Sequence, residues 1–226
     1  DIVADPTLLA DFQTNENGDV KQYWLGRTVI HSDHRYTYED VQQIIETKEG
    51  LHQEEILLLN EMAQKLRKKR FSKGAINFSS QEVRFQLDEK GVPIGIVVKE
   101  SKESHQLIEE FMLLANRTVA ENIAKQHINK KPIPFPYRVH DQPDEEKLAP
   151  FIQYAKRYGH SFDISTPQAI AHSFNGMLAD AHGKPEQHVL EQLGIRTMAK
   201  AIYTPENIGH YGLAFEHYCH FTSPIR

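Results

Sequence analysis

The sequence predicts an α+β fold, with antiparallel strands in the first half and a mostly helical second half. Short extended segments bounded by turn residues occur before residue 100, and four later segments repeat apolar residues at helical spacing. Because the strands come first and do not alternate with the helices, an α+β fold is favoured over an alternating fold with a parallel sheet. The 226 residues, of which 39% are hydrophobic, are enough to bury a sizeable core.

The first two strands are predicted to form a hairpin from segments 8–12 and 20–32. Asn17 and Gly18 lie between them, and an Asn-Gly dipeptide supplies the positive φ angles of a tight turn. Three further extended segments are expected at 74–78, 82–87 and 93–99.

Two helices are predicted between these groups of strands. Thr37 and Asp40 have the spacing of a capping box, and Gly50 ends the helix that begins there. The second helix, at about 54–71, ends in six cations within nine positions, which form either a solvated helix end or a phosphate-contacting surface. The cations are Lys65, Arg67, Lys68, Lys69, Arg70 and Lys73.

Four more helices are predicted in the remainder of the chain. The third of them begins with Thr166 as its N-cap and Pro167 at its first helical position. Their expected bounds are about 103–126, 144–157, 166–181 and 185–200.

The helix at 103–126 is apolar nearly all round and carries two adjacent carboxylates. Its period places Glu110 on a solvated stripe with Arg117 and Glu121, whereas Glu109 and Asn116 lie among apolar neighbours. A buried carboxylate costs several kcal/mol unless it is paired or hydrogen-bonded, so Glu109 is expected to have a partner. That partner belongs either to an internal ion pair or to a functional site.

Charge, composition and motifs exclude several classes of function. The net charge of −5 does not favour a dedicated nucleic-acid-binding module, although an acidic enzyme can admit RNA through a local basic channel. No membrane span or signal peptide is expected, and the single cysteine, Cys219, predicts a cytoplasmic protein. Nucleotide-loop, hydrolase and dinucleotide motifs are absent. A structural zinc site at His217, Cys219 and His220 is a weaker alternative because it lacks a second ligand pair.

Several segments together resemble one enzyme family. The chain resembles the RNB-type exoribonucleases, ribonuclease II and ribonuclease R, at LIEEFMLLANR (107–117), YRVH (137–140) and HFTSPIR (220–226). It is similar to the ribonuclease R branch in particular at WLGRTVIHS (24–32). The segments occur in the family's order, and the resemblance covers residues 8–226.

The resemblance implies a function and a cofactor. The family hydrolyses single-stranded RNA in the 3′-to-5′ direction and releases nucleoside 5′-monophosphates. Two Mg²⁺ ions stabilise the attacking and leaving oxygens in that reaction. Single-stranded RNA is therefore the expected partner, with no membrane and no DNA.

The resemblance also assigns site residues. Arg226 matches an arginine that contacts the scissile phosphate, and its planar fork suits that task. Glu109 matches the active-site glutamate, and Glu110 stays an alternative, although the helical-face argument favours Glu109. Tyr38 matches a tyrosine near the 3′-terminal nucleotide, and Phe78 matches an aromatic that packs against terminal bases or is plain core. The other candidate RNA-contacting residues are Glu110, Asn116, Arg138, His140, His220 and Ser223.

The sequence departs from the family pattern at the metal site. The family's metal ligands are clustered aspartates upstream of the segment at 24–32, and Asp1, Asp5, Asp11 and Asp19 do not reproduce that cluster. No metal ligand is therefore assigned in this chain. We expect residues 1–226 to be a partial catalytic domain without the acidic segment and the flanking cold-shock and S1-type domains, inactive alone. The alternative is a non-catalytic RNA-binding pseudo-enzyme on the same scaffold.

Overall fold

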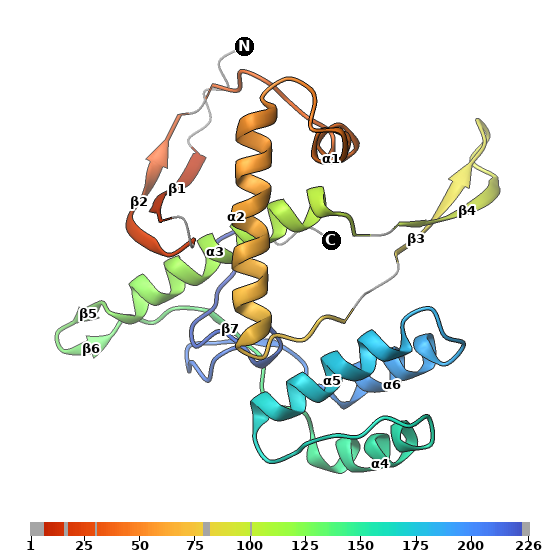
Figure 1. The fold of residues 1–226 in the computed structure, drawn as a ribbon. Helices are drawn as coiled ribbons and strands as arrows, with labels where there is room; N and C mark the ends of the chain where they lie inside the picture. The colour runs from red at the N-terminus through yellow and green to blue at the C-terminus, as the bar shows by residue number, and fades with distance from the viewer. Residues whose placement is uncertain (1–6, 16–17, 30, 79–81, 100, 223–226) are drawn as a thin grey trace.

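The structure, a computed structural model, describes residues 7–15, 18–29, 31–78, 82–99 and 101–222. Its elements are β1 (Thr7–Thr14), β2 (Val20–Thr28), α1 (Tyr38–Thr47), α2 (Gln53–Ser72), β3 (Glu82–Leu87), β4 (Pro93–Lys99), α3 (Glu103–Ala124), β5 (His127–Ile128), β6 (Lys131–Pro132), β7 (Tyr137–Val139), α4 (Glu145–Lys156), α5 (Pro167–Ala181), α6 (Gln187–Thr197) and β8 (Ile202–Thr204). Helix α2 stands at the centre, α3 crosses it, and the β1–β2 and β3–β4 hairpins lie on opposite sides (Figure 1).

The predicted α+β class is confirmed. Every sheet among the described residues is a two-stranded antiparallel pair, with β1–β2 and β3–β4 ahead of α3. Two further pairs, β5–β6 and β7–β8, were not predicted, because strands of two or three residues are too short to show an alternating pattern. No helix in the described ranges has both the length and the apolar character needed to cross a membrane.

The predicted hairpins are confirmed, with one strand shorter than expected. In the first, the Asp19 N–H donates to Asn15 Oδ1 at 2.8 Å, and Gly18 has φ +73°. Strand β2 ends at Thr28, short of the predicted residue 32. The β3–β4 pair matches its predicted ranges.

The predicted strand at 74–78 is wrong. The Ile76 N–H donates to the Gly212 carbonyl at 3.0 Å, and the Asn77 N–H donates to Asn175 Oδ1 at 3.0 Å. The two acceptors are thus the Gly212 carbonyl and a side chain on α5. Within the described residues, no strand pairs with this segment. It instead connects α2 to the helical group formed by α4, α5 and α6.

All six predicted helices are confirmed to within a few residues at each end. At α1 the Asp40 N–H donates to Thr37 Oγ1 at 3.1 Å and the Thr37 N–H donates to Asp40 Oδ2 at 3.0 Å, which completes the predicted capping box. At α5 the Ala169 N–H donates to Thr166 Oγ1 at 3.1 Å. These caps depend on residues within one turn, which is why sequence spacing alone predicted them.

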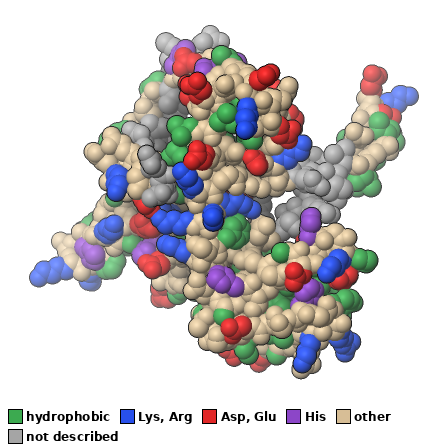
Figure 2. Space-filling model, in the orientation of Figure 1, with side chains coloured by type: hydrophobic (Ala, Val, Ile, Leu, Met, Phe, Trp, Pro, Cys, Tyr) green, Lys and Arg blue, Asp and Glu red, His purple; other side chains and the backbone are tan. Residues whose placement is uncertain are grey.

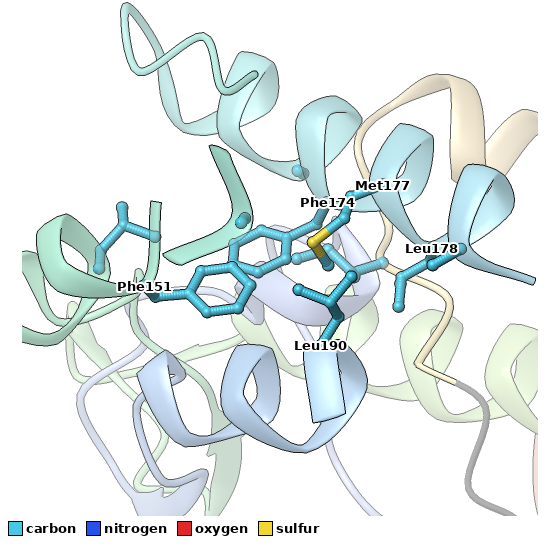
Figure 3. Packing of buried hydrophobic residues seen from close by; sticks show 10 residues of the cluster. Phe151, Phe174, Met177, Leu178 and Leu190 are labelled. Carbon is cyan, nitrogen blue, oxygen red and sulfur yellow. The ribbon is translucent and has the colours of Figure 1, made fainter. Parts of the chain in front are cut away.

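The larger apolar core joins α4, α5 and α6 (Figure 3). Phe151 and Phe174 stack with ring centroids 5.5 Å apart, and Leu190 closes the cluster from α6. Phe78 packs against this core with its ring 5.7 Å from Phe174. Of the two interpretations offered for Phe78, core packing is the one that these contacts favour.

A smaller core lies against the C-terminal half of α3. Val119 and Ala120 of α3 pack against Tyr137 and Val139 of β7 and against Cys219. This cluster attaches the end of the described chain to the middle of α3. Candidate site residues that are distant in sequence therefore share one helix as their support.

Candidate functional site

A buried arginine–glutamate cluster lies where α2 crosses α3. Glu110 is 3% exposed and accepts from Arg70 through Nη2 and through Nε, the latter at 3.2 Å. Arg67 Nη1 donates to the same carboxylate at 3.3 Å. The two arginine side chains are themselves 5% and 16% exposed. The cluster is therefore an internal ion triad that joins the two helices.

The predicted burial of the two adjacent glutamates is wrong. Glu110 was placed on a solvated stripe with Arg117 and Glu121, but α2 covers the Glu110 end of that stripe. Glu109 was expected to be buried, yet its side chain is 36% exposed, with Oε1 3.9 Å from Arg70 Nη2. The helical period gave the relative positions of the two residues correctly, but it could not show which side α2 packs on. Glu109 is therefore the accessible carboxylate of the two, contrary to its predicted burial, and it stays the candidate site residue.

The basic run at the end of α2 has an exposed part and a buried part, and neither interpretation given to the run predicted the buried part. Arg67 and Arg70 point into the contact with α3 and are used there. The four lysines of the run are exposed, and Lys69 is paired with Asp19. Figure 2 shows Lys and Arg side chains gathered over the middle of this face, where the second half of α2 lies.

One stripe of α3 carries three polar residues with different surroundings. His105, Glu109 and Asn116 lie within about 40° of one another around the helix at 100° per residue. Tyr38 of α1 stacks on His105 with ring centroids 4.3 Å apart and planes 12° apart. The stacked pair thus lies beside α3 at the position one helical turn before Glu109.

Asn116 fastens the end of the described chain to α3. Its side chain is fully buried, its Nδ2 donates to the Thr222 carbonyl at 2.8 Å, and its Oδ1 accepts from the Thr222 N–H at 2.7 Å. Nδ2 also donates to the Tyr218 hydroxyl at 3.2 Å, and the Asn116 carbonyl accepts from Cys219 Sγ. Both amide hydrogens are used within the chain. This favours a structural role for Asn116 over the predicted RNA contact.

His140 is also engaged within the chain. The Gly212 N–H donates to His140 Nδ1 at 2.9 Å, so Nε2 carries the ring proton and donates to the Ala199 carbonyl at 2.9 Å. Burial is the main cause that lowers the pKa of His140 and keeps the ring neutral. These contacts favour a structural role for the neutral His140 ring over the predicted RNA contact.

The stability of this region is expected to depend on pH through His210. Burial, with the nearby His140 and Arg138, lowers the pKa of His210 to about 3, whereas an unfolded histidine titrates near about 6.5. Between these values the unfolded chain binds a proton that the folded chain does not, so stability falls as pH decreases. The expected slope from this group is up to about 1.4 kcal/mol per pH unit.

Urea unfolding at pH 7.5, 6.5 and 5.5 measures this slope. His140 and His220 act in the same direction, because burial lowers both of their pKa values. The informative comparison is therefore with His210→Gln, which should show a flatter dependence. Equal slopes for the two proteins would contradict the prediction.

Arg138 and His220 meet around an exposed tyrosine. The Arg138 guanidinium lies 4.6 Å from the Tyr203 ring centroid, and the Tyr203 hydroxyl is 2.6 Å from His220 Nδ1. Tyr218 connects this group to α3, since its ring lies 5.6 Å from that of His220 and its hydroxyl binds Asn116. The structure thus links Asn116, His220 and Arg138 through the contacts of Tyr218 and Tyr203.

Other predicted site residues are not brought to this region, or cannot be placed. Phe78 belongs to the core of the helical group. Ser223 and Arg226 lie outside the described residues. Tyr203 and Tyr218 were missed, because their neighbours come from distant segments and no local pattern marks them.

A cleft of about 450 Å³ opens beside the ion triad, between α2, α3 and residues 214–216. It is lined by charges of both signs, so it does not form a uniformly basic channel for phosphates. The charged lining residues are Lys69, Arg70, Lys73, Glu110, Arg117, Glu121 and Glu216. Within the described ranges, no group of three or more His, Cys, Asp or Glu residues is arranged to hold a metal ion. The described residues therefore do not fit a two-Mg²⁺ site.

The fold is an α+β domain in which α3 supports several of the candidate residues. The RNB domain model matches residues 3–226, so the chain belongs to the RNB domain family.

Curated relatives carry ribonuclease names. The chain is 35% identical to ribonuclease R of Aquifex aeolicus over 94% of its own length and 30% of that protein. It is 36% identical to DIS3-like exonuclease 2 of Schizosaccharomyces pombe over 95% of its own length and 25% of that protein. The chain thus spans less than a third of these two relatives.

Solved structures share the fold. Ribonuclease R of Mycoplasma genitalium, in complex with ribose-methylated single-stranded RNA, matches 97% of this chain and 34% of its own with a TM-score of 0.82 and 27% identity. Yeast Ssd1, described as a pseudonuclease, matches with a TM-score of 0.70 and 20% identity. The second match shows the fold alone.

Proposed function

We propose that this chain is part of an exoribonuclease that hydrolyses single-stranded RNA from the 3′ end and releases nucleoside 5′-monophosphates. The observation that carries the proposal is the α3 stripe, where the accessible Glu109 lies one turn from the stacked pair Tyr38 and His105, in a chain of the RNB family. An aromatic stack can receive a base without regard to sequence. A carboxylate accepts hydrogen bonds from ribose hydroxyls, which DNA lacks at the 2′ position.

The Mg²⁺ ions of this reaction would come with ligands from outside these residues. This part of the proposal rests on the resemblance, which assigns the metal ligands to an aspartate cluster that the chain does not reproduce. Bound metal would activate the attacking water and stabilise the leaving oxygen. The residues of this chain would bind and orient the RNA, with Arg226 as the expected phosphate contact.

RNA as the partner is supported by the structural relatives. Two Mycoplasma genitalium ribonuclease R structures are complexes, one with ribose-methylated single-stranded RNA and one with double-stranded RNA. The preference for single strands, the direction of hydrolysis and a cytoplasmic location stay predictions for this protein.

The chain itself is expected to bind RNA without cleaving it. We would incubate it with a 5′-labelled single-stranded RNA and Mg²⁺, with an EDTA control, and measure both binding and product length. The expected result is binding tighter than to DNA of the same sequence, with the RNA left intact. Stepwise shortening that EDTA abolishes would contradict the placement of the metal ligands outside this chain.

The preference for RNA over DNA tests the role of Glu109. Glu109→Gln weakens an acceptor of a ribose hydroxyl, so the difference between RNA and DNA affinities should decrease. Glu121→Gln is the matched control, because Glu121 lies on the same helix, is 43% exposed and pairs with Arg117. An unchanged preference in Glu109→Gln would contradict the proposed contact.

An RNA hydrolysis assay of the protein that contains this chain distinguishes the enzyme from the pseudo-enzyme. With Mg²⁺, stepwise release of nucleoside 5′-monophosphates from the 3′ end is the expected result. RNA binding without product would mean that the non-catalytic alternative is correct. No RNA binding would contradict both.

A further inference from the structure

The pairing of β7 with β8 places an arginine next to an exposed tyrosine. Arg138 and Tyr203 are direct partners in the antiparallel register, so their side chains lie on the same face of the two strands. The guanidinium carbon lies 4.6 Å from the Tyr203 ring centroid, within the range of a cation–π contact. The arginine therefore occupies one face of the ring.

A second contact fixes the hydroxyl end of the same tyrosine. The hydroxyl is 2.6 Å from His220 Nδ1, and the two rings are 82° apart in plane. Burial, followed by the charge of Arg138, lowers the pKa of His220, which favours a neutral ring that can accept from the hydroxyl. Tyr203 is thus held at its ring and at its hydroxyl, yet it is 57% exposed.

This combination distinguishes Tyr203 from the other aromatic residues of the described chain. The other cation–π contacts found there involve Phe71 and Phe215, whose rings are only partly exposed. Tyr158 is also exposed, at 44%, but its contact is with Tyr154 in the last turn of α4. An ordinary surface tyrosine keeps its rotamer freedom, whereas Tyr203 is already ordered before any ligand arrives.

We propose that Arg138, Tyr203 and His220 form a stacking site for a nucleobase of single-stranded RNA. A base would stack on the ring of Tyr203 opposite Arg138, and the guanidinium would attract a neighbouring phosphate. The inference rests on the proposed RNA partner and adds a second contact region to the α3 stripe. Tyr218 lies between the two, with its ring 5.6 Å from His220 and its hydroxyl bound by Asn116.

The test is the affinity of the protein for a fluorescent single-stranded RNA, measured by anisotropy. Tyr203→Ala should weaken binding by about five-fold or more, because loss of one base–aromatic stack costs about 1–3 kcal/mol. Tyr203→Phe keeps the ring and should bind within about three-fold of the unaltered protein, since only the hydroxyl contact is lost. Tyr158→Ala is the matched control and should bind normally.

A second ligand separates stacking from phosphate attraction. On an abasic RNA of the same length, Tyr203→Ala and the unaltered protein should bind equally, because no base is present to stack. Equal binding of the two proteins to the normal RNA would overturn the stacking site while leaving the proposed function intact. Failure of the unaltered protein to bind RNA would overturn both. Circular dichroism of Tyr203→Ala shows whether its fold is retained. If the fold is lost, the comparison of Tyr203→Phe with the unaltered protein tests the site instead.

Discussion

Replacing Glu110 by alanine is expected to destabilise the protein by about 3–5 kcal/mol. The substitution leaves the buried Arg70 and the nearly buried Arg67 without their shared carboxylate. Breaking a buried ion pair from one side costs this much because a charge stays in a low-dielectric site without compensation. Glu109 lies 3.9 Å from Arg70 and is too exposed to replace the lost partner fully. Urea unfolding followed by circular dichroism measures the change.

Two further variants make this prediction specific. Glu121→Ala removes an exposed carboxylate from the same helix and should cost less than about 1 kcal/mol. The pair Glu110→Met with Arg70→Met removes both main charges and should recover part of the stability, since apolar residues of similar size often replace buried ion pairs without loss. A loss for Glu110→Ala no larger than that for Glu121→Ala would show that the triad does not join α2 and α3.

Replacing Asn116 by leucine is expected to lower the free energy of unfolding by about 2–4 kcal/mol. It should also detach the segment around Thr222 from α3 locally. Leucine has a similar size, so the effect comes from polar groups left without partners. These are the N–H and carbonyl of Thr222 and the hydroxyl of Tyr218. Because Arg226 lies four residues beyond Thr222 in the sequence, the same substitution should weaken RNA binding if Arg226 contacts a phosphate.

The single thiol of the chain reports this release directly. Cys219 is buried, and burial raises its pKa, so the native protein should react slowly with a thiol reagent. In Asn116→Leu the labelling should be faster without denaturant, because local opening exposes the thiol. Asn122→Leu is the control and should label slowly, because the Asn122 side chain accepts from Gln126 just beyond the end of α3 and not from the segment that carries Cys219. Equal labelling rates in the two variants would contradict the fastening role of Asn116.

Some of the candidate site could be predicted from the sequence, because the residues lie in a local motif or match the family's residues. The motif at 107–117 led to α3, and Tyr38 stacks on His105, one turn before Glu109 on that helix. The role of Tyr38 near a nucleotide stays a prediction. The residues that each site residue contacts could not be predicted. Tyr203 meets Arg138 only because β8 returns to pair with β7, and nothing near either residue in the sequence indicates that pairing.

The sequence by itself determined the α+β class, the order of the longer elements and the capped starts of α1 and α5. Capping at Thr37 and Thr166 and the turn before β2 involve residues within a few positions of one another, so their energies are local. Only the tertiary structure decided which of Glu109 and Glu110 is buried. Helical periodicity fixes the angle between two side chains, but the side that becomes interior depends on where α2 packs, and burial is a property of the whole fold.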